Sequence, residues 1–236
     1  MVVAVIIAGG VGSRMGADIP KPFVQVNGKP VLFYTLEAFE RHPMVDAIEL
    51  VCIEGWEASV WAWENKYGIT KLKWIVKGGA SGQESIRNGV YGLEGKCHAN
   101  DVVVIHDGIR PLVEPAVLDD VIGKARQFGN GVTSMPYNEQ IFLIDAERPD
   151  TTTKYIPRDT LRRVATPQAY QFGLLDEKYH EAFAKKIGIH GASYANTMMA
   201  ELGVRLYFAA GSDRNIKLTT LGDIEIFKAM IGEKER

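Results

Sequence analysis

The chain alternates short apolar runs with longer stretches in which apolar residues recur every three or four positions. Most of the short runs are nearly continuous in apolar character, as VVAVIIA at residues 2–8 illustrates. Strands of that kind are covered on both faces, which is typical of a parallel sheet between two helical layers. The predicted strands are residues 2–8, 48–53, 73–76, 102–106, 132–136 and 204–209.

Helical periodicity fills the intervals between these strands. The predicted helices are residues 30–40, 56–67, 83–93, 115–128, 174–186 and 220–231. Regular alternation of strand and helix predicts βαβ crossovers, so we expect an α/β sandwich with helices on both faces of the sheet. The sequence contains no repeat, low-complexity tract or linker, and a single domain over residues 1–236 is expected.

Residues 138–163 break this rhythm. They include FLIDAERPDTTTKYIPRDTLRR, in which short alternating strands flank a polar Pro-Asp turn. The pattern predicts a β-arm that stands off the sheet. Such an arm can form a contact between subunits, can act as a lid over a site, or can be an ordinary surface loop. The pattern fits each of these three roles.

Composition narrows the class of protein. The net charge of −2 gives no electrostatic case for nucleic acid as a partner. Cys52 and Cys97 are the only cysteines, and their wide spacing argues against a zinc site or a disulfide framework, as expected in a reducing cytoplasm. The apolar run at residues 2–8 is about half as long as a membrane span needs to be. It has no basic region before it, so we expect a buried strand and no membrane segment.

The loop after the first predicted strand, AGGVGSRMGADIPKPF, is rich in glycine. Gly9, Gly10 and Gly12 permit positive φ and let backbone N–H groups approach a phosphate closely. The dinucleotide pattern G-x-G-x-x-G does not fit, because Met15 stands where the third glycine belongs. The ATPase-type phosphate loop does not fit either, because no lysine follows a glycine as that pattern requires.

Two cations remain in this loop. Arg14 has the geometry for bidentate contacts with phosphate oxygens, and Lys21 adds a point charge beside Pro20. Two cations and a loop of amides suit a triphosphate attacked at its α-phosphate, because negative charge builds up there in the transition state. The alternative is a tight strand-to-helix turn with solvated charges.

Further motifs follow later strands, and the carboxyl ends of parallel strands are where ligands collect. In HDGIRP, Asp107 is placed either to hold Mg²⁺ beside phosphates or to cap a helix. KGGASGQES is a second glycine loop, whose Ser85 either reads a base edge or simply lies in the first helical turn. RNIKLTT adds Lys217, and ATPQAY follows the arm. We expect these motifs to converge on one sheet edge.

Taken in order, G-G-x-G-x-R-M-G with P-K, G-G with a serine before a helix, H-D-x-x-R-P, T-P-Q and N-I-K-x-T-T resemble the cytidylyltransferases that act on methylerythritol phosphate or ribitol 5-phosphate. The match covers nearly the whole chain, and the combination is specific although each motif alone is not. The resemblance implies an α/β nucleotidyltransferase fold with a Rossmann-like sheet, and a protruding β-arm that supports a homodimer. It also implies attack by a phosphomonoester oxygen on the α-phosphate of CTP, release of pyrophosphate and a requirement for Mg²⁺.

The resemblance also implies a role for individual residues. Arg14 and Lys21 would stabilise charge on the α-phosphate, and Lys217 would assist from the opposite side. The nucleotide would be bound by Ala8, Gly9, Gly10, Gly12, Gly79, Ala80 and Ser85. The acceptor would be bound by Asp107, Arg110, Arg158 and Thr166, with Asp107 beside the metal and Arg158 reaching across the dimer.

The departures from the family pattern lie among the residues expected to bind the acceptor and among the residues that support them. Glu139 and Gln140 replace the usual Asp-Thr pair, Gly82 replaces an arginine before the base-reading serine, and residues 193–203 lack the usual Thr-Asp stretch. The nucleotide side is intact. We predict a CTP-dependent cytidylyltransferase for a small polyol phosphate, with an alditol phosphate such as ribitol 5-phosphate favoured for polysaccharide or teichoic acid synthesis. The methylerythritol phosphate enzyme of isoprenoid synthesis is the alternative.

Two rival functions stay open at this point. A non-catalytic homologue would bind CTP without turnover, and the altered acceptor residues are compatible with it. A sugar-phosphate nucleotidyltransferase using UTP or GTP shares the opening glycine loop, but H-D-x-x-R-P and N-I-K argue against that class.

Overall fold

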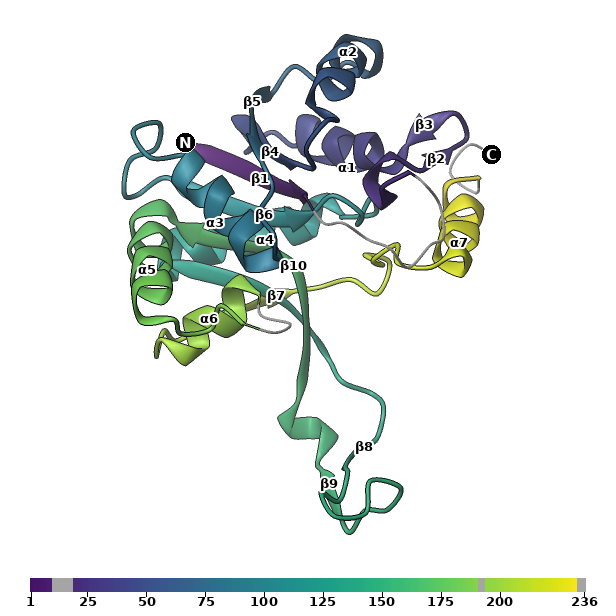
Figure 1. Ribbon diagram of the computed structural model, residues 1–236, viewed down its shortest axis with the longest axis vertical. Coiled ribbons are helices and arrows are strands. Elements are labelled where there is room, and N and C mark those ends of the chain that lie inside the picture. Colours follow the sequence, from purple (N-terminus) through teal and green to yellow (C-terminus); the bar gives the residue numbers. More distant parts are fainter. Residues whose placement is uncertain (10–18, 191–193, 233–236) are drawn as a thin grey trace.

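The computed structural model describes residues 1–9, 19–190 and 194–232, and it shows a body built around a sheet with an arm projecting from it (Figure 1). The predicted site residues Gly10, Gly12 and Arg14 lie outside the described residues, as does the first residue of the 193–203 stretch. The main sheet has the order β11-β7-β10-β6-β1-β4-β5. Its strands are β1 (Val2–Ala8), β4 (Ala47–Cys52), β5 (Leu72–Lys77), β6 (Val102–Asp107), β7 (Asn130–Pro136), β10 (Arg162–Gln171) and β11 (Phe208–Ala210).

The sheet is mostly parallel, as the apolar runs predict. Strand β1 pairs in parallel with β4 and β6, β4 pairs with β5, and β7 pairs with β11. Within the main sheet, as far as the described residues form it, β10 alone runs antiparallel, between β6 and β7. The carboxyl ends of β1, β5 and β6 therefore meet at one edge, which is where the predicted motifs lie.

Strand β10 is the main difference from the sequence prediction, which places no strand at residues 165–170. This segment is buried throughout, at the centre of the sheet. Pro167 has no N–H to donate, and the pairing of β10 with β7 shifts register between Val164 and Gln168. A bulge of this kind lets the ladder accommodate a proline that would otherwise argue against a central strand.

Helices cover both faces of the sheet, because side chains of β1 alternate between two cores. Val2, Ala4 and Ile6 pack with apolar residues of α1 and α4, whereas Val3 and Val5 pack with those of α3, α5 and α6. This confirms the predicted sandwich. The helices are α1 (Val31–Glu40), α2 (Glu57–Tyr67), α3 (Gly82–Gly92), α4 (Pro115–Phe128), α5 (Phe172–Lys185), α6 (Ala195–Glu201) and α7 (Leu221–Gly232).

The arm forms as predicted. Strands β8 (Ile141–Leu143) and β9 (Lys154–Ile156) pair antiparallel near its far end (Figure 1), and the short helix η3 (Arg158–Thr160) leads back into β10. Other short elements are η2 (Lys21–Phe23), β2 (Gln25–Val26) and β3 (Lys29–Pro30). No helix among the described residues is long and apolar enough to cross a membrane.

The boundaries of several elements differ from the predictions. Strand β1 and helix α4 match them, but the strand predicted at residues 204–209 shrinks to Phe208–Ala210. Helix α6 is absent from the predicted helices and packs Met198 and Met199 into the core. Short elements at the rim of a core carry few periodic positions, so their limits depend on neighbouring elements.

Candidate active site

The loops after β1 and β5 touch each other through their backbones. A Cβ added to Gly9 would lie 2.9 Å from the Cα of Gly78 and 3.2 Å from the Oγ of Ser85. Ala8 and Gly9 are buried at the end of β1, and the Gly78 N–H donates to the Cys52 carbonyl at 2.8 Å. Glycine is needed here because any side chain would separate the two predicted nucleotide loops.

The second loop is held in shape by the first turn of α3. Ser81 caps the helix in a capping box with Glu84, so its hydroxyl and the Glu84 carboxylate satisfy each other's backbone N–H groups. The Ser85 hydroxyl is buried, donates to the Ser81 carbonyl at 2.9 Å and accepts from the Gly79 N–H at 3.0 Å. Ser85 thus lies in the first helical turn and shapes the loop, and one lone pair remains for a ligand donor.

The neighbouring Ala80 is exposed at the tip of the same loop. A Cβ on Gly79 would lie 2.3 Å from the Cβ of Glu84, closer than van der Waals contact permits. The loop is therefore compact, and its Gly78, Gly79 and Ser81 N–H groups already donate to Cys52, Ser85 and Glu84. Nucleotide binding by Gly79 and Ala80 stays a prediction.

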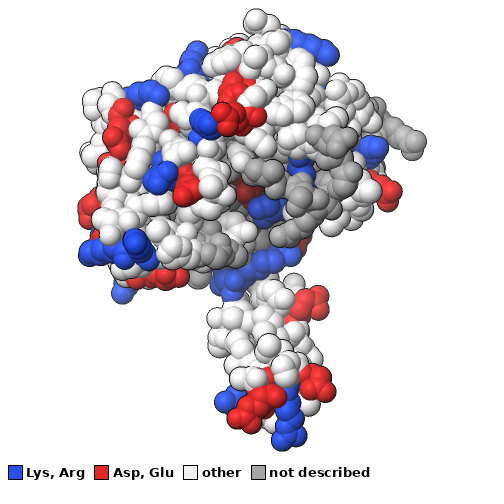
Figure 2. Space-filling view, viewed as in Figure 1, with Lys and Arg blue, Asp and Glu red and all other residues white. Residues whose placement is uncertain are grey.

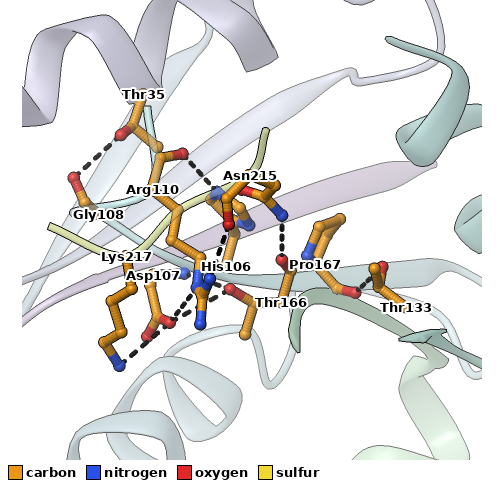
Figure 3. A network of polar contacts seen from close by, with 10 residues as sticks. All are labelled: Thr35, His106, Asp107, Gly108, Arg110, Thr133, Thr166, Pro167, Asn215 and Lys217. Atoms are coloured by element: carbon orange, nitrogen blue, oxygen red, sulfur yellow. Dashed lines mark hydrogen bonds and ion pairs between the residues drawn. The ribbon is translucent and has the colours of Figure 1, made fainter. Parts of the chain in front are cut away.

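A cluster of polar side chains surrounds Asp107 at the end of β6 (Figure 3). Its Oδ2 accepts from Arg110 Nε at 2.9 Å and from Thr166 Oγ1 at 3.3 Å, and it lies 3.2 Å from Lys217 Nζ. Burial opposes ionisation of this carboxyl, but the charges of Lys217 and Arg110 outweigh burial and hold its pKa below the usual range. The structure brings together four of the predicted residues: Asp107, Arg110, Thr166 and Lys217.

Buried hydrogen bonds fix the geometry of this cluster. Arg110 Nη1 donates to the Asn215 carbonyl at 2.8 Å, and Asn215 Nδ2 donates to the Thr166 carbonyl at 2.7 Å. His106 Nε2 bonds to the Arg110 carbonyl at 3.0 Å, and burial lowers the pKa of His106 to about 4. The imidazole is therefore neutral near pH 7 and donates from Nε2. His106 has the structural role that its buried position favours.

Asn215 is a residue whose role the sequence analysis missed. The N-I-K motif includes it, but nothing in a single sequence indicates that its amide joins β10 to the segment before α7. Its side chain is almost fully buried, and its carbonyl and Nδ2 link Arg110 to Thr166. Asn215 therefore holds the Asp107 cluster in place.

Lys21 contacts the segment at residues 214–220, which also carries Lys217. Lys21 begins η2, and its Nζ donates to the Thr219 carbonyl at 3.0 Å although 198 residues separate the two positions. The Asp223 carboxylate accepts from the Thr219 N–H and hydroxyl and from the Thr220 N–H. These bonds hold residues 219 and 220, so Lys21 contacts the same segment that carries Lys217.

Arg158 does not join the cluster within one chain. It is exposed on η3 in the arm, and its Nη1 donates to the Asn138 carbonyl at 3.1 Å. Figure 1 shows the arm standing away from the body. Arg158 begins η3, the short helix that precedes β10. Basic side chains gather where the arm leaves the body (Figure 2). Arg162 and Arg163, the first residues of β10, are exposed.

Asp107 also has the chemistry to bind a metal ion. All the side-chain contacts of Asp107 described above use Oδ2, which leaves Oδ1 for a cation. Mg²⁺ commonly takes one or two carboxylate ligands and completes its coordination with substrate phosphates. Elsewhere in the described chain, Glu94, Asp176 and His180 bring three ligand atoms within 4.8 Å of one another. Glu94 follows the far end of α3, whereas the glycine loop precedes the start of that helix. A metal bound with the triphosphate therefore fits Asp107.

Comparisons with known proteins show which sequences this chain is similar to. A family model described as 2-C-methyl-D-erythritol 4-phosphate cytidylyltransferase (IspD) matches residues 2–233. A ribitol-5-phosphate cytidylyltransferase of Lacticaseibacillus paracasei is 55% identical over 235 residues, covering 100% of both chains. A 2-C-methyl-D-erythritol 4-phosphate cytidylyltransferase of Syntrophotalea carbinolica is 34% identical and covers 98% of this chain and 96% of that protein.

The fold is similar to that of solved structures. The crystal structure of 4-diphosphocytidyl-2C-methyl-D-erythritol synthase from Anaerococcus prevotii superposes with a TM-score of 0.81 at 23% identity, covering 98% of each chain. At that identity the likeness shows the fold alone. The predicted α/β nucleotidyltransferase fold and the predicted resemblance are both confirmed.

Proposed function

The chain belongs to the 2-C-methyl-D-erythritol 4-phosphate cytidylyltransferase family, and from that premise we propose that it joins CMP to ribitol 5-phosphate. A phosphate oxygen of the acceptor attacks the α-phosphorus of CTP, the bond to the β-phosphate oxygen breaks, and pyrophosphate leaves. The product is a CDP-alditol. The observation that carries this acceptor is the 55% identity, over the full length of both chains, to a protein named ribitol-5-phosphate cytidylyltransferase.

We assign the chemistry to positioning and charge stabilisation, without a covalent nucleophile. We assign Lys21, Lys217 and Arg14 to the stabilisation of the charge that develops on the α-phosphate. Asp107 orients Arg110 and Lys217 through its Oδ2 contacts and keeps them at the phosphates. Thr166 holds Asp107 through two bonds, because its Oγ1 accepts from the Asp107 N–H and donates to Oδ2.

The nucleotide lies, in this proposal, against Ala8, Gly9, Gly79 and Ala80, with Ser85 behind the base, and Gly10 and Gly12 complete the phosphate loop. Mg²⁺, when bound with CTP at Asp107, would neutralise phosphate charge and withdraw electrons from the phosphorus. We expect a chelator to abolish turnover and added Mg²⁺ to restore it, which an assay of pyrophosphate release will measure. Full turnover in a chelator would contradict the metal assignment.

We propose that the working unit is a homodimer formed through the arm. Phe142, Leu143, Ile144 and Tyr155 are exposed on β8, β9 and the turn after β8, between 47% and 74% of their surface. A hollow of about 550 Å³ lies among residues of β8, β9 and η3, including Arg158. A second copy would cover these apolar side chains and would receive Arg158 at its acceptor site.

Two finer assignments accompany the reaction. The product class suits polysaccharide or teichoic acid synthesis, and the single domain over residues 1–236 would carry the whole activity. Cys52 and Cys97 are both free, which is compatible with the cytoplasm, where CTP is available.

The decisive test is an acceptor panel with CTP and Mg²⁺, measured as pyrophosphate release. We expect the highest kcat/KM with ribitol 5-phosphate, compared with methylerythritol, erythritol, glycerol and hexitol phosphates. Lys21→Ala, Arg14→Ala and Lys217→Ala should each reduce kcat by at least about 100-fold, because each removes a charge from the transition state. Lys185→Ala, which removes an exposed lysine of α5, is the matched control and should leave activity unchanged.

Each alternative function has its own outcome in this assay. A higher kcat/KM with methylerythritol phosphate would assign the chain to isoprenoid synthesis. CTP binding without turnover across the panel would identify a non-catalytic homologue. Preference for UTP or GTP over CTP in competition would identify a sugar-phosphate nucleotidyltransferase.

A further inference from the structure

The ammonium group of Lys217 lies between a carboxylate and an aromatic ring. Its Nζ is 3.2 Å from Asp107 Oδ2 and 5.5 Å from the centroid of the Tyr194 ring. The second distance is within the range of a cation–π interaction, in which the negative face of the ring attracts a cation. Two different groups therefore hold this lysine.

The Asp107 carboxylate and the Tyr194 ring differ in the charge that they bring to Lys217. Asp107 is shared, because the same oxygen also accepts from Arg110 at 2.9 Å, so one negative charge faces two positive charges. A second carboxylate beside Lys217 would cancel the remaining positive charge. An aromatic face attracts the ammonium but carries no net charge, so the local charge stays positive for an anionic substrate.

Hydrogen bonds hold the backbone of Tyr194, so the position from which its side chain extends is fixed. The Tyr194 N–H donates to Thr197 Oγ1 at 2.7 Å, and the Tyr194 carbonyl accepts from the same hydroxyl at 2.8 Å and from the Met198 N–H at 3.0 Å. The side chain itself is 45% exposed and is not part of the core. Packing in the interior thus does not explain why this position carries an aromatic ring.

A buried glutamine connects this residue to the nucleotide loop. Gln83 is 2% exposed in the first turn of α3, two residues before Ser85. Its Nε2 donates to the carbonyls of Gly188 and Tyr194 at 2.8 and 3.3 Å, and its Oε1 accepts from the Tyr179 hydroxyl at 3.0 Å. The loop proposed to bind the base and the residue that contacts Lys217 therefore share one rigid support.

We propose that Tyr194 is a positioning residue, whose ring face holds the Lys217 ammonium toward the substrate phosphate without neutralising it. This inference rests on the proposed cytidylyltransferase function and on the role of Lys217 in it. The ring is the operative part. It is the ring centroid that lies 5.5 Å from Lys217 Nζ.

The test compares variants at position 194, with and without Lys217→Ala, in the pyrophosphate assay. Tyr194→Phe keeps the ring and should retain kcat within about 2-fold, whereas Tyr194→Leu and Tyr194→Met should lower kcat by about 3- to 10-fold. The KM for CTP should change less than kcat, because Lys217 acts mainly on charge that develops in the transition state. In a Lys217→Ala background, Tyr194→Leu should have little further effect.

Thermal unfolding provides the structural control. All variants at position 194 should unfold within about 2 °C of wild type, because the side chain is half exposed. Wild-type activity in Tyr194→Leu and Tyr194→Met, an equal loss in Tyr194→Phe, or a full additional loss in the Lys217→Ala background would each overturn the proposal. Wild-type protein without CTP turnover would instead overturn the proposed function itself.

Discussion

Glu49 is a carboxylate buried in the middle of β4. Its side chain has no exposed surface, and neither oxygen has a hydrogen-bond partner among the described residues. Lys96 Nζ lies 3.7 Å from Oε2, too far for a hydrogen bond. A Cβ on Gly92 of α3 would lie only 2.9 Å from the same oxygen, so the glycine leaves room for the carboxylate. Burial raises the pKa of Glu49 to about 7, and the charge of Lys96 only partly opposes the rise.

The raised pKa predicts how Glu49 affects stability. An unfolded chain loses the Glu49 proton near pH 4.5, but the folded chain keeps it up to about pH 7. Ionisation therefore disfavours the folded state progressively across this window, and the full penalty remains above it. Glu49→Gln should raise the free energy of unfolding at pH 8 by up to about 3 kcal/mol and have little effect at pH 4.

Urea unfolding at pH 4, 6 and 8 will check this prediction by the difference between variant and wild type. Glu177→Gln, at an exposed carboxylate of α5, should show no such pH-dependent difference. A Glu49→Gln protein that is less stable than wild type at pH 8 would show that the ionised carboxylate contributes favourably through Lys96.

At the scale of elements, the loop between β5 and α3 depends on close backbone packing. Gly79 approaches the start of α3 so tightly that a Cβ would lie 2.9 Å from the Ser85 backbone nitrogen. An alanine must displace either the loop or the first helical turn. Because the Gly79 N–H also donates to Ser85 Oγ, the displacement would break a bond that shapes the predicted base pocket.

Gly79→Ala should therefore raise the KM for CTP by at least about 10-fold and lower stability by about 1–3 kcal/mol, as overpacking generally does. Gly123→Ala makes the same chemical change inside α4, where an added Cβ meets no atom of the described residues within 4 Å. That control should bind CTP normally and should be slightly more stable, because alanine favours a helix. Steady-state kinetics and thermal unfolding of both variants will decide. Normal CTP kinetics in Gly79→Ala would show that the loop tolerates a side chain.

At the scale of the whole molecule, the arm separates one predicted acceptor residue from the rest of the site. Arg158 is exposed on the arm, while Lys21, Asp107 and Lys217 gather at the sheet edge of the body. If the arm of one copy completes the site of another, two chains with different defects can complement each other. Arg158 would be missing from one copy and Lys21 from the other.

We expect Lys21→Ala and Arg158→Ala to be inactive alone, and a mixture refolded or co-expressed at equal amounts to recover about a quarter of wild-type activity. Half of the dimers would then be mixed, and each mixed dimer would have one complete site. Activity and mass in solution should be measured on the same samples. A dimeric mixture that stays inactive would show that Arg158 acts within its own chain, or outside the site.

Features set by local pattern were predictable from the sequence, whereas features set by contacts between distant segments were not. The loop motifs of Asp107 and Lys217 and the limits of β1 and α4 are readable from local pattern, because periodicity and strand-end position are local properties. Strand β10 is not readable in this way. Its proline argues against a central strand, and only its pairing with β6 and β7 shows how a bulge accommodates the proline.

By itself, the sequence determined the fold class, the arm, the family resemblance and most of the chemical groups at the site. The tertiary structure alone decided which groups meet: Thr166 with Asp107 across 59 residues, Lys21 with Thr219 across 198, and Tyr194 with Lys217. The physical reason is that apolar patterning reports how each segment buries its own faces. Contacts between side chains distant in the chain depend instead on strand order and loop packing, which no single segment encodes.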